Sequence, residues 1–247
     1  MRLRTWQTWL PTLIVAGTAG CAAGAGGGRS RSASPLAGPG QSALVSFADS
    51  FVSSHGADSG FICDRFEPAA TGYRFTESFA YGPRYYRTTD VYLSPGLVVD
   101  SVRARGNSHG LVLDIDATYS GRRVGGWFVV TEADTLRRVA IETELPDSAF
   151  DAAAQMALLP TFDWHVGMKR NLHEFDPERG RTNSSMLEVV AEERITVPAG
   201  TFDTYRAEMT QARSLVWLWF TRAAPHRPVK VVDPVHHWTT ELVALIE

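Results

Sequence analysis

After residue 72 the chain alternates between apolar and polar residues in short runs. Between Leu111 and Tyr119 every second residue is apolar, and acidic residues or threonine fill most of the other positions. This period of two is typical of a half-buried β-strand. Residues of the kinds found in turns, mainly Gly, Pro and Asp, separate the runs. The alternation predicts strands at 73–80, 85–93, 97–105, 111–119, 124–131, 136–144, 186–197, 202–209, 214–221, 229–232 and 238–246.

Short strands separated by turns every 8–12 residues are typical of an antiparallel meander. The sequence therefore predicts a mainly β protein, with a strongly curved antiparallel sheet or an open β-barrel and one or two packed helices. Residues 164–181 read partly as strand and partly as a charged loop.

Two segments have helical spacing instead. In Ser42–Ser54, apolar residues recur at i, i+3, i+4 and i+7, which predicts a short amphipathic helix covering the sheet. Residues 146–160 begin at an Asp or Ser suited to capping a helix and end at Pro160, with small apolar residues between. This second segment predicts a helix that lies on the sheet.

The best-defined turn lies within Arg194–Arg206. Pro198 fixes the φ angle of the first turn position, and Gly200 can adopt the positive φ that closes the turn. The strand that follows is apolar on both faces, with Trp217 and Trp219 on one of them. A strand of this kind is covered on both sides by other parts of the protein, by a ligand or by a partner.

The N-terminus has the layout of a secretory leader. A basic segment, Met1–Arg4, precedes an apolar run over residues 9–16 that is too short to span a membrane. Thr18-Ala-Gly-Cys21 resembles the bacterial lipobox, which implies that residues 1–20 are removed and that Cys21 carries the acyl chains, including palmitate. Ordinary cleavage near Ala22 is the alternative. Because Ala22 and not Asp follows Cys21, Gram-negative sorting rules imply the outer membrane, with the protein facing the periplasm.

The rest of the chain reads as a tether and one domain. Residues 21–41 are rich in Gly, Ala, Ser and Pro, and they predict a flexible tether from the lipidated Cys21. Residues 42–247 predict a single β-rich domain. With Cys21 acylated, Cys63 has no partner for an intrachain disulfide. The net charge of −3 and the absence of a basic stripe argue against nucleic acid as a partner.

Candidate chemistry is sparse. Gly106–Gly110 matches G-x-S-x-G, but a strand follows it, whereas the nucleophile elbow needs a helix there. A hairpin loop is the simpler interpretation, and a serine hydrolase using Ser108 is the alternative. The histidines and cysteines do not have zinc spacing, and no phosphate-binding loop occurs. The sequence thus predicts no catalytic residue, no metal and no cofactor.

Aromatic residues on the predicted strands are the remaining candidates for a site. We expect a hydrophobic ligand to contact Trp217, Trp219, Trp127 and Phe202. The alternative is that these side chains fill the core of a curved sheet.

The C-terminal part resembles a family of bacterial envelope proteins of the DUF3108 type. The resemblance rests on Val197–Arg206, which reads VPAGTFDTYR, on Leu218–Phe220, and on Pro225–Lys230. It implies an open β-barrel broadly similar to the lipoprotein carriers LolA and LolB. It also implies a non-enzymatic lipoprotein that binds a lipid or acyl chain or serves envelope maintenance. An interaction or assembly module with a solid core is the alternative, and the oligomeric state is left open.

Overall fold

The computed structural model describes residues 46–56, 58–82, 85–108, 111–132, 135–211 and 214–246. The predicted leader, the lipidation site Cys21, the tether and the start of the predicted helix at 42–54 lie outside this described part. Within it, one sheet of fifteen strands accounts for most of the residues.

The first half of the sheet runs in chain order from the N-terminal side. Its strands are β1 (Phe47–His55), β2 (Asp58–Ala69), β3 (Gly72–Tyr81), β4 (Tyr85–Leu93), β5 (Val99–Ser108), β6 (Leu111–Ser120), β7 (Arg123–Glu132) and β8 (Thr135–Glu144).

The second half follows a short helical connection. Its strands are β9 (Ala149–Asp151), β10 (Lys169–Asp176), β11 (Arg181–Val197), β12 (Gly200–Gln211), β13 (Ser214–Thr221), β14 (Pro228–Asp233) and β15 (Trp238–Ile246). The connection contains two 3₁₀ turns, η2 (Ala152–Ala154) and η3 (Leu159–Thr161), on either side of helix α1 (Gln155–Leu158).

The two halves meet at a single seam. The strand order is β8 to β1, then β15 to β9, so every neighbouring pair except β1–β15 is consecutive in the chain. All pairs are antiparallel except β9 with β10. Across the seam the Ser53 and Thr240 hydroxyls hydrogen-bond at 3.0 Å. The predicted antiparallel, strongly curved sheet is confirmed.

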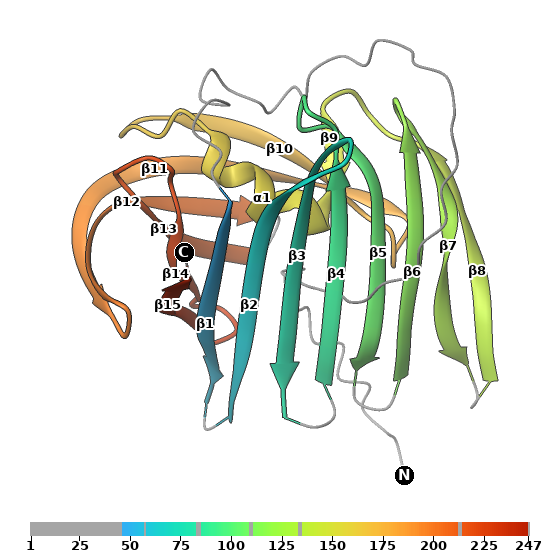
Figure 1. Ribbon diagram of the computed structural model, residues 1–247, viewed down its shortest axis with the longest axis horizontal. Helices are drawn as coiled ribbons and strands as arrows, with labels where there is room; N and C mark the ends of the chain where they lie inside the picture. The colour runs from blue at the N-terminus through green and yellow to red at the C-terminus, as the bar shows by residue number, and fades with distance from the viewer. Residues whose placement is uncertain are drawn as a thin grey trace.

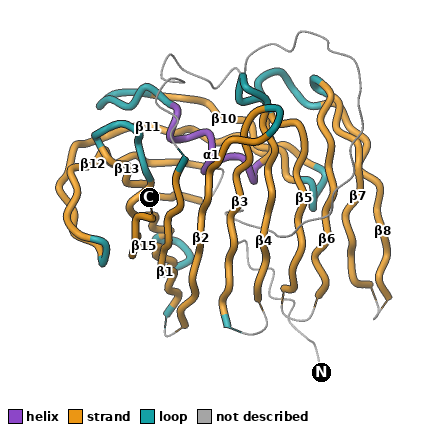
Figure 2. Tube along the Cα trace, viewed as in Figure 1, coloured by secondary structure: helices purple, strands orange, loops and turns teal. Residues whose placement is uncertain are grey.

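The sheet curls around the helical connection without closing (Figure 1). Figure 2 shows α1 on the concave side, between the two halves of the sheet. All four residues of α1 are buried, which a helix this short needs because tertiary packing provides most of its stability. The edge strand β9 contacts β5. The hydroxyl of Tyr119, on β6, donates a hydrogen bond to the carboxylate of Asp151, on β9. The prediction of a helix over residues 146–160 is confirmed only for Gln155–Leu158, which a 3₁₀ turn flanks on each side. It is wrong for Ala149–Asp151, because these residues pair with β10 as strand β9.

The hairpin between β11 and β12 follows its sequence closely. Val197 pairs with Gly200, so Pro198 and Ala199 form the two-residue connection. Gly200 has φ = 133°, a value that residues with a Cβ rarely adopt. The Ala199 N–H donates a hydrogen bond of 3.0 Å to the Leu242 carbonyl of β15, so this hairpin is tied to the C-terminal strand.

The prediction of a helix over Ser42–Ser54 is wrong for its described part, which is strand β1. Phe47, Asp49, Phe51 and Ser53 are all buried on one face, a period of two. The alternation was hidden because two of the four buried residues are polar. Strand β2 was missed for the same reason, since Asp64 is buried between Ile62 and Phe66.

Candidate ligand cavity

The concave face of the sheet and α1 enclose a cavity of about 60 Å³. This volume is several times the ~10–15 Å³ that one water molecule needs. Strands from both halves of the sheet form its wall, together with one residue of α1. The wall consists of Phe51, Ile62, Asp64, Glu77, Phe79, Tyr85, Met156, Val216, Val231, Asp233, His236, Trp238 and Thr240. Most of these side chains are apolar, and the polar ones are mainly acidic.

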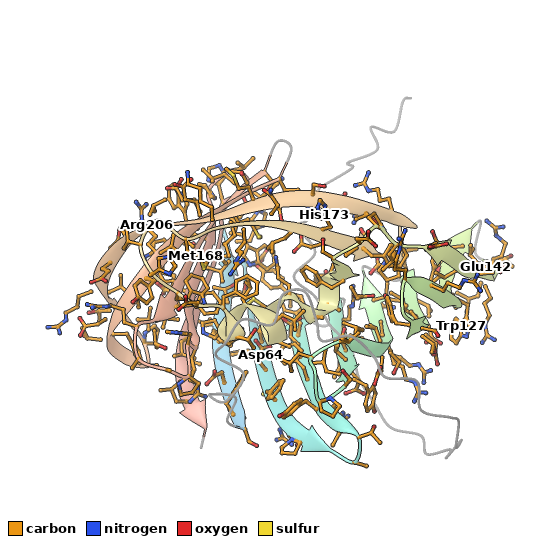
Figure 3. All side chains as sticks on the ribbon, turned by 90° about the horizontal axis from the view of Figure 1, so that it is seen from above. Asp64, Trp127, Glu142, Met168, His173 and Arg206 are labelled. Carbon is orange, nitrogen blue, oxygen red and sulfur yellow. The ribbon has the colours of Figure 1, made fainter. Side chains whose placement is uncertain are left out.

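The acidic part of the wall belongs to a row of carboxyl groups across β1, β2 and β3. Asp49 lies opposite Asp64 in the strand register, and Asp64 lies opposite Glu77. Their exposed fractions are only 0%, 2% and 4%. Side chains directly opposite one another on antiparallel strands have Cβ atoms ~5 Å apart. In Figure 3, Asp64 lies between the β1–β2 side of the sheet and the helical connection.

Two arginines lie near this row of carboxyl groups. Arg227 binds both carboxylate oxygens of Asp49, with 3.0 Å between Nε and Oδ2. Arg87, on β4, donates a hydrogen bond of 2.7 Å to Glu178. No ion pair is found for Asp64 or Glu77 within the described residues, and Asp64 Oδ1 has no hydrogen-bond partner there.

Burial raises the pKa of all three carboxyl groups. The pKa of Asp49 rises to about 6 because desolvation outweighs the effect of Arg227. Burial raises the pKa of Glu77 to about 8, against the opposing charge of Arg87. The pKa of Asp64 is well above its ordinary value through burial, with the nearby charges of Glu77 and Asp49 acting in the same direction. Two adjacent buried carboxyl groups do not both ionise readily, so the ionisation of Asp64 and that of Glu77 oppose each other.

The cavity wall next to the carboxyl row is aromatic. The rings of Phe79 and Tyr85 meet edge to face, with 5.0 Å between their centroids. The centroids of the Phe79 and Trp238 rings are 6.2 Å apart. The Trp238 indole N–H donates a hydrogen bond of 3.2 Å to the Thr240 hydroxyl. The cavity therefore combines aromatic faces with a carboxyl pair.

The turn between β14 and β15 forms the remaining polar side. Asp233 Oδ1 accepts hydrogen bonds of 2.9 Å from the backbone N–H groups of Val235 and His236. Asp233 Oδ2 lies 2.7 Å from His236 Nδ1. Asp233 thus fixes the position of the imidazole in the cavity wall.

The four aromatic residues expected to bind a ligand are not part of this wall. Trp217 and Trp219 project from the opposite face of β13 to Val216, which does line the cavity. The Trp219 indole N–H instead donates a hydrogen bond of 3.0 Å to Glu193. Phe202 borders a separate shallow groove beside Tyr205 and Arg222.

Trp127 lies far from the cavity. Figure 3 shows Trp127 toward one end of the molecule, whereas Asp64 lies near the middle. The guanidinium carbon of Arg138 lies 3.8 Å from the centroid of its indole ring, so a cation covers this ring. The structure therefore does not bring the four residues together, and ligand binding by them stays a prediction.

The G-x-S-x-G segment forms part of a β-hairpin. Ser108 ends β5 and pairs in register with Leu111 at the start of β6. A Cβ on Gly106 would lie 2.2 Å from the Tyr86 carbonyl oxygen, which gives this glycine a packing role. The helix that a nucleophile elbow requires does not follow, since β6 does.

Two further searches cover the described residues only. Among them, no group of three or more His, Cys, Asp and Glu side chains is arranged to hold a metal ion. The described part also contains no helix with the length and apolar character to cross a membrane.

Asp64 and Glu77 were not among the residues predicted to form a site, whereas Trp238 was one of the aromatic candidates on the predicted strands. Asp64 and Glu77 interrupt otherwise apolar faces in Phe61–Phe66 and Phe75–Phe79, and each is a polar residue in a position whose neighbours two residues away are buried. A polar residue in the register of the buried apolar residues is therefore a sequence signal that could have identified Asp64 and Glu77. Their side-by-side arrangement depends on strand register, which the sequence pattern alone does not give.

The fold and the cavity define the class of protein: an open, β-barrel-like sheet that curls around a short helix and leaves a small cavity inside. Residues 88–235 match the family model described as DUF3108, a protein family of unknown function. This chain belongs to the DUF3108 family, which confirms the resemblance inferred from its hairpin.

Comparison with one solved structure supports the same fold. A β-barrel-like protein of the domain of unknown function DUF1849 from Brucella abortus is similar, with 9% identity and a TM-score of 0.50. The alignment covers 82% of this chain and 98% of that one. A protein with a YmcC-like fold from Bacteroides fragilis has 10% identity and a TM-score of 0.36, over 81% of this chain and 95% of its own. No curated protein matches the sequence.

Proposed function

We propose that this protein is a non-enzymatic, lipid-anchored component of the bacterial cell envelope that binds a small, mainly apolar molecule. The ligand would occupy the cavity between the concave face of the sheet and α1. The observation that carries this proposal is the cavity itself, a space of about 60 Å³ lined by strands from both halves of the sheet. Its wall combines apolar side chains with a few polar groups, as is typical of small-molecule sites.

The location is proposed from the N-terminal sequence. A leader followed by Cys21 supports export and acylation, and Ala22 after the cysteine supports the outer membrane with the domain facing the periplasm. The alternative of an interaction module would place the function on the outer surface and would not need an open cavity.

Ligand binding can be tested on the full chain carrying Cys21→Ser, which removes the acylation site and the need for detergent. Native mass spectrometry should detect a bound small molecule after purification. The neutral probe 3,3-dimethylbutan-1-ol should compete for the cavity in ligand-detected NMR. Ile62→Trp would fill the cavity and should abolish probe binding.

Phe61→Trp is the matched control, because Phe61 is the next residue on β2 and is 66% exposed on the other face. It should bind the probe like the parent chain. A parent chain that carries no ligand and binds no apolar probe would contradict the proposed function.

A further inference from the structure

The cavity contains a buried acidic pair that lies near the charge of Arg87 but forms no ion pair with it. Asp49 has Arg227, and Arg87 has Glu178, but Asp64 and Glu77 have no ion-pair partner in the described part of the chain. Asp64 is 2% exposed and lines the cavity, and its Oδ1 atom has no hydrogen-bond partner. An unpartnered buried carboxylate oxygen is costly, so a group that donates to it would be bound favourably.

The part of the wall next to this pair suits a positive charge as well. Phe51, Phe79, Tyr85 and Trp238 present aromatic rings to the cavity. The faces of aromatic rings attract cations, and aromatic walls are the usual binding sites for organic ammonium groups.

We propose that the cavity binds the ammonium head of a small organic amine or quaternary ammonium compound. The positive head lies between the Asp64–Glu77 pair and the aromatic rings, and the apolar body contacts Met156 and Val216. This inference rests on the proposed function and specifies the chemical class of its ligand.

Choline and 3,3-dimethylbutan-1-ol form a matched pair of probes. They have the same shape, and a carbon atom in the alcohol replaces the charged nitrogen. Isothermal titration calorimetry on the full chain carrying Cys21→Ser should give a choline affinity at least about tenfold higher than that of the alcohol at pH 7.5.

The double variant Asp64→Asn/Glu77→Gln removes both charges and keeps the size of both side chains. It should bind choline no more tightly than the alcohol. The matched control is Asp58→Asn/Glu67→Gln, which changes two carboxylates of β2 that do not line the cavity. The control should keep the preference for choline.

A pH series provides a second measurement. The charge of choline does not change with pH, so only groups on the protein titrate. The charged and titratable groups around Asp64 are Asp49, Cys63, Glu77, Tyr85, Arg87, Arg227, Asp233 and His236. A cation favours the ionised form of the Asp64–Glu77 pair, whose pKa values are raised, so its binding releases a proton and choline affinity should rise between pH 6 and 8 by up to about tenfold per unit.

Glu77→Gln should flatten this rise, because Asp64 then ionises without the opposing charge of Glu77, while Asp49 and His236 are unchanged. This single variant tests the inference even if the double variant does not fold. Equal affinity for choline and the alcohol would overturn the ammonium inference and leave the proposed function standing. Unchanged choline binding by the double variant would also overturn it. If neither probe binds the parent chain, both proposals fail.

Discussion

Glu77→Gln should change how the stability of this protein depends on pH. Glu77 is almost completely buried, and its pKa is raised to about 8 from an ordinary value of 4.5. Between these two values the folded chain keeps a proton that the unfolded chain has lost. The free energy of unfolding therefore falls as pH rises through this window, and the loss is complete above about pH 8.

The magnitude follows from the size of the shift. One proton of difference between the folded and unfolded states costs roughly 1 kcal/mol per pH unit. Over pH 5–8, Glu77 should thus remove on the order of 3 kcal/mol of stability. Glutamine has no proton to lose and does not repel Asp64, whose own pKa should fall. The variant should be close to the parent chain at pH 5 and clearly more stable at pH 8.

Urea unfolding followed by tryptophan fluorescence at pH 5, 6, 7 and 8 measures this difference. Glu144→Gln is the control, since Glu144 is an exposed carboxylate at the end of β8. The control should have the same pH dependence as the parent chain. If the parent chain and Glu77→Gln lose stability in parallel over this range, Glu77 is not the buried acid described above.

Three further predictions test other parts of the molecule. Arg227→Met should cost on the order of 3 kcal/mol at pH 7 in urea unfolding, because it leaves buried Asp49 without its cation; the cost should be smaller at pH 5, below the Asp49 pKa of about 6. Gly126→Ala should cost on the order of 3 kcal/mol, since φ is 152° and a Cβ would lie 2.0 Å from a carbonyl oxygen of β6. Gly125→Ala, with open space around its Cβ position, should change stability by less than ~0.5 kcal/mol, and equal losses for the two would contradict this account. Cys21→Ser should abolish metabolic labelling with palmitate, and labelling that persists would refute acylation at this residue.

The sequence pattern predicted the strands of the sheet well wherever the buried face was apolar. In β6 the alternation between Leu111 and Tyr119 marks both faces, and the Pro198–Gly200 hairpin has the residues that its turn requires. Prediction failed in β1 and β2, where Asp49 and Asp64 occupy buried positions. Asp49 is tolerated there because of Arg227, 178 residues away in the chain. A local pattern does not contain that partner.

The candidate cavity was missed for a related reason. Its wall takes residues from seven strands, and their proximity depends on how β1 and β15 pair. The prominent aromatic pair Trp217 and Trp219 lies on the other face of β13. Large aromatic residues in a strand indicate burial, but they do not indicate which face encloses a site.

The pairing of β1 with β15 also determines when the cavity can form during folding. Each half of the sheet consists of neighbours in the chain, so each can form early through local hairpins. The hydroxyls of Ser53 and Thr240, by contrast, meet across 187 residues, and contacts at such separation form late. Strands from both halves of the sheet line the cavity, and Trp238 and Thr240 of β15 are among the lining residues. Before β15 pairs with β1 the cavity lacks part of its wall, so the cavity is complete only when the last strand pairs with the first.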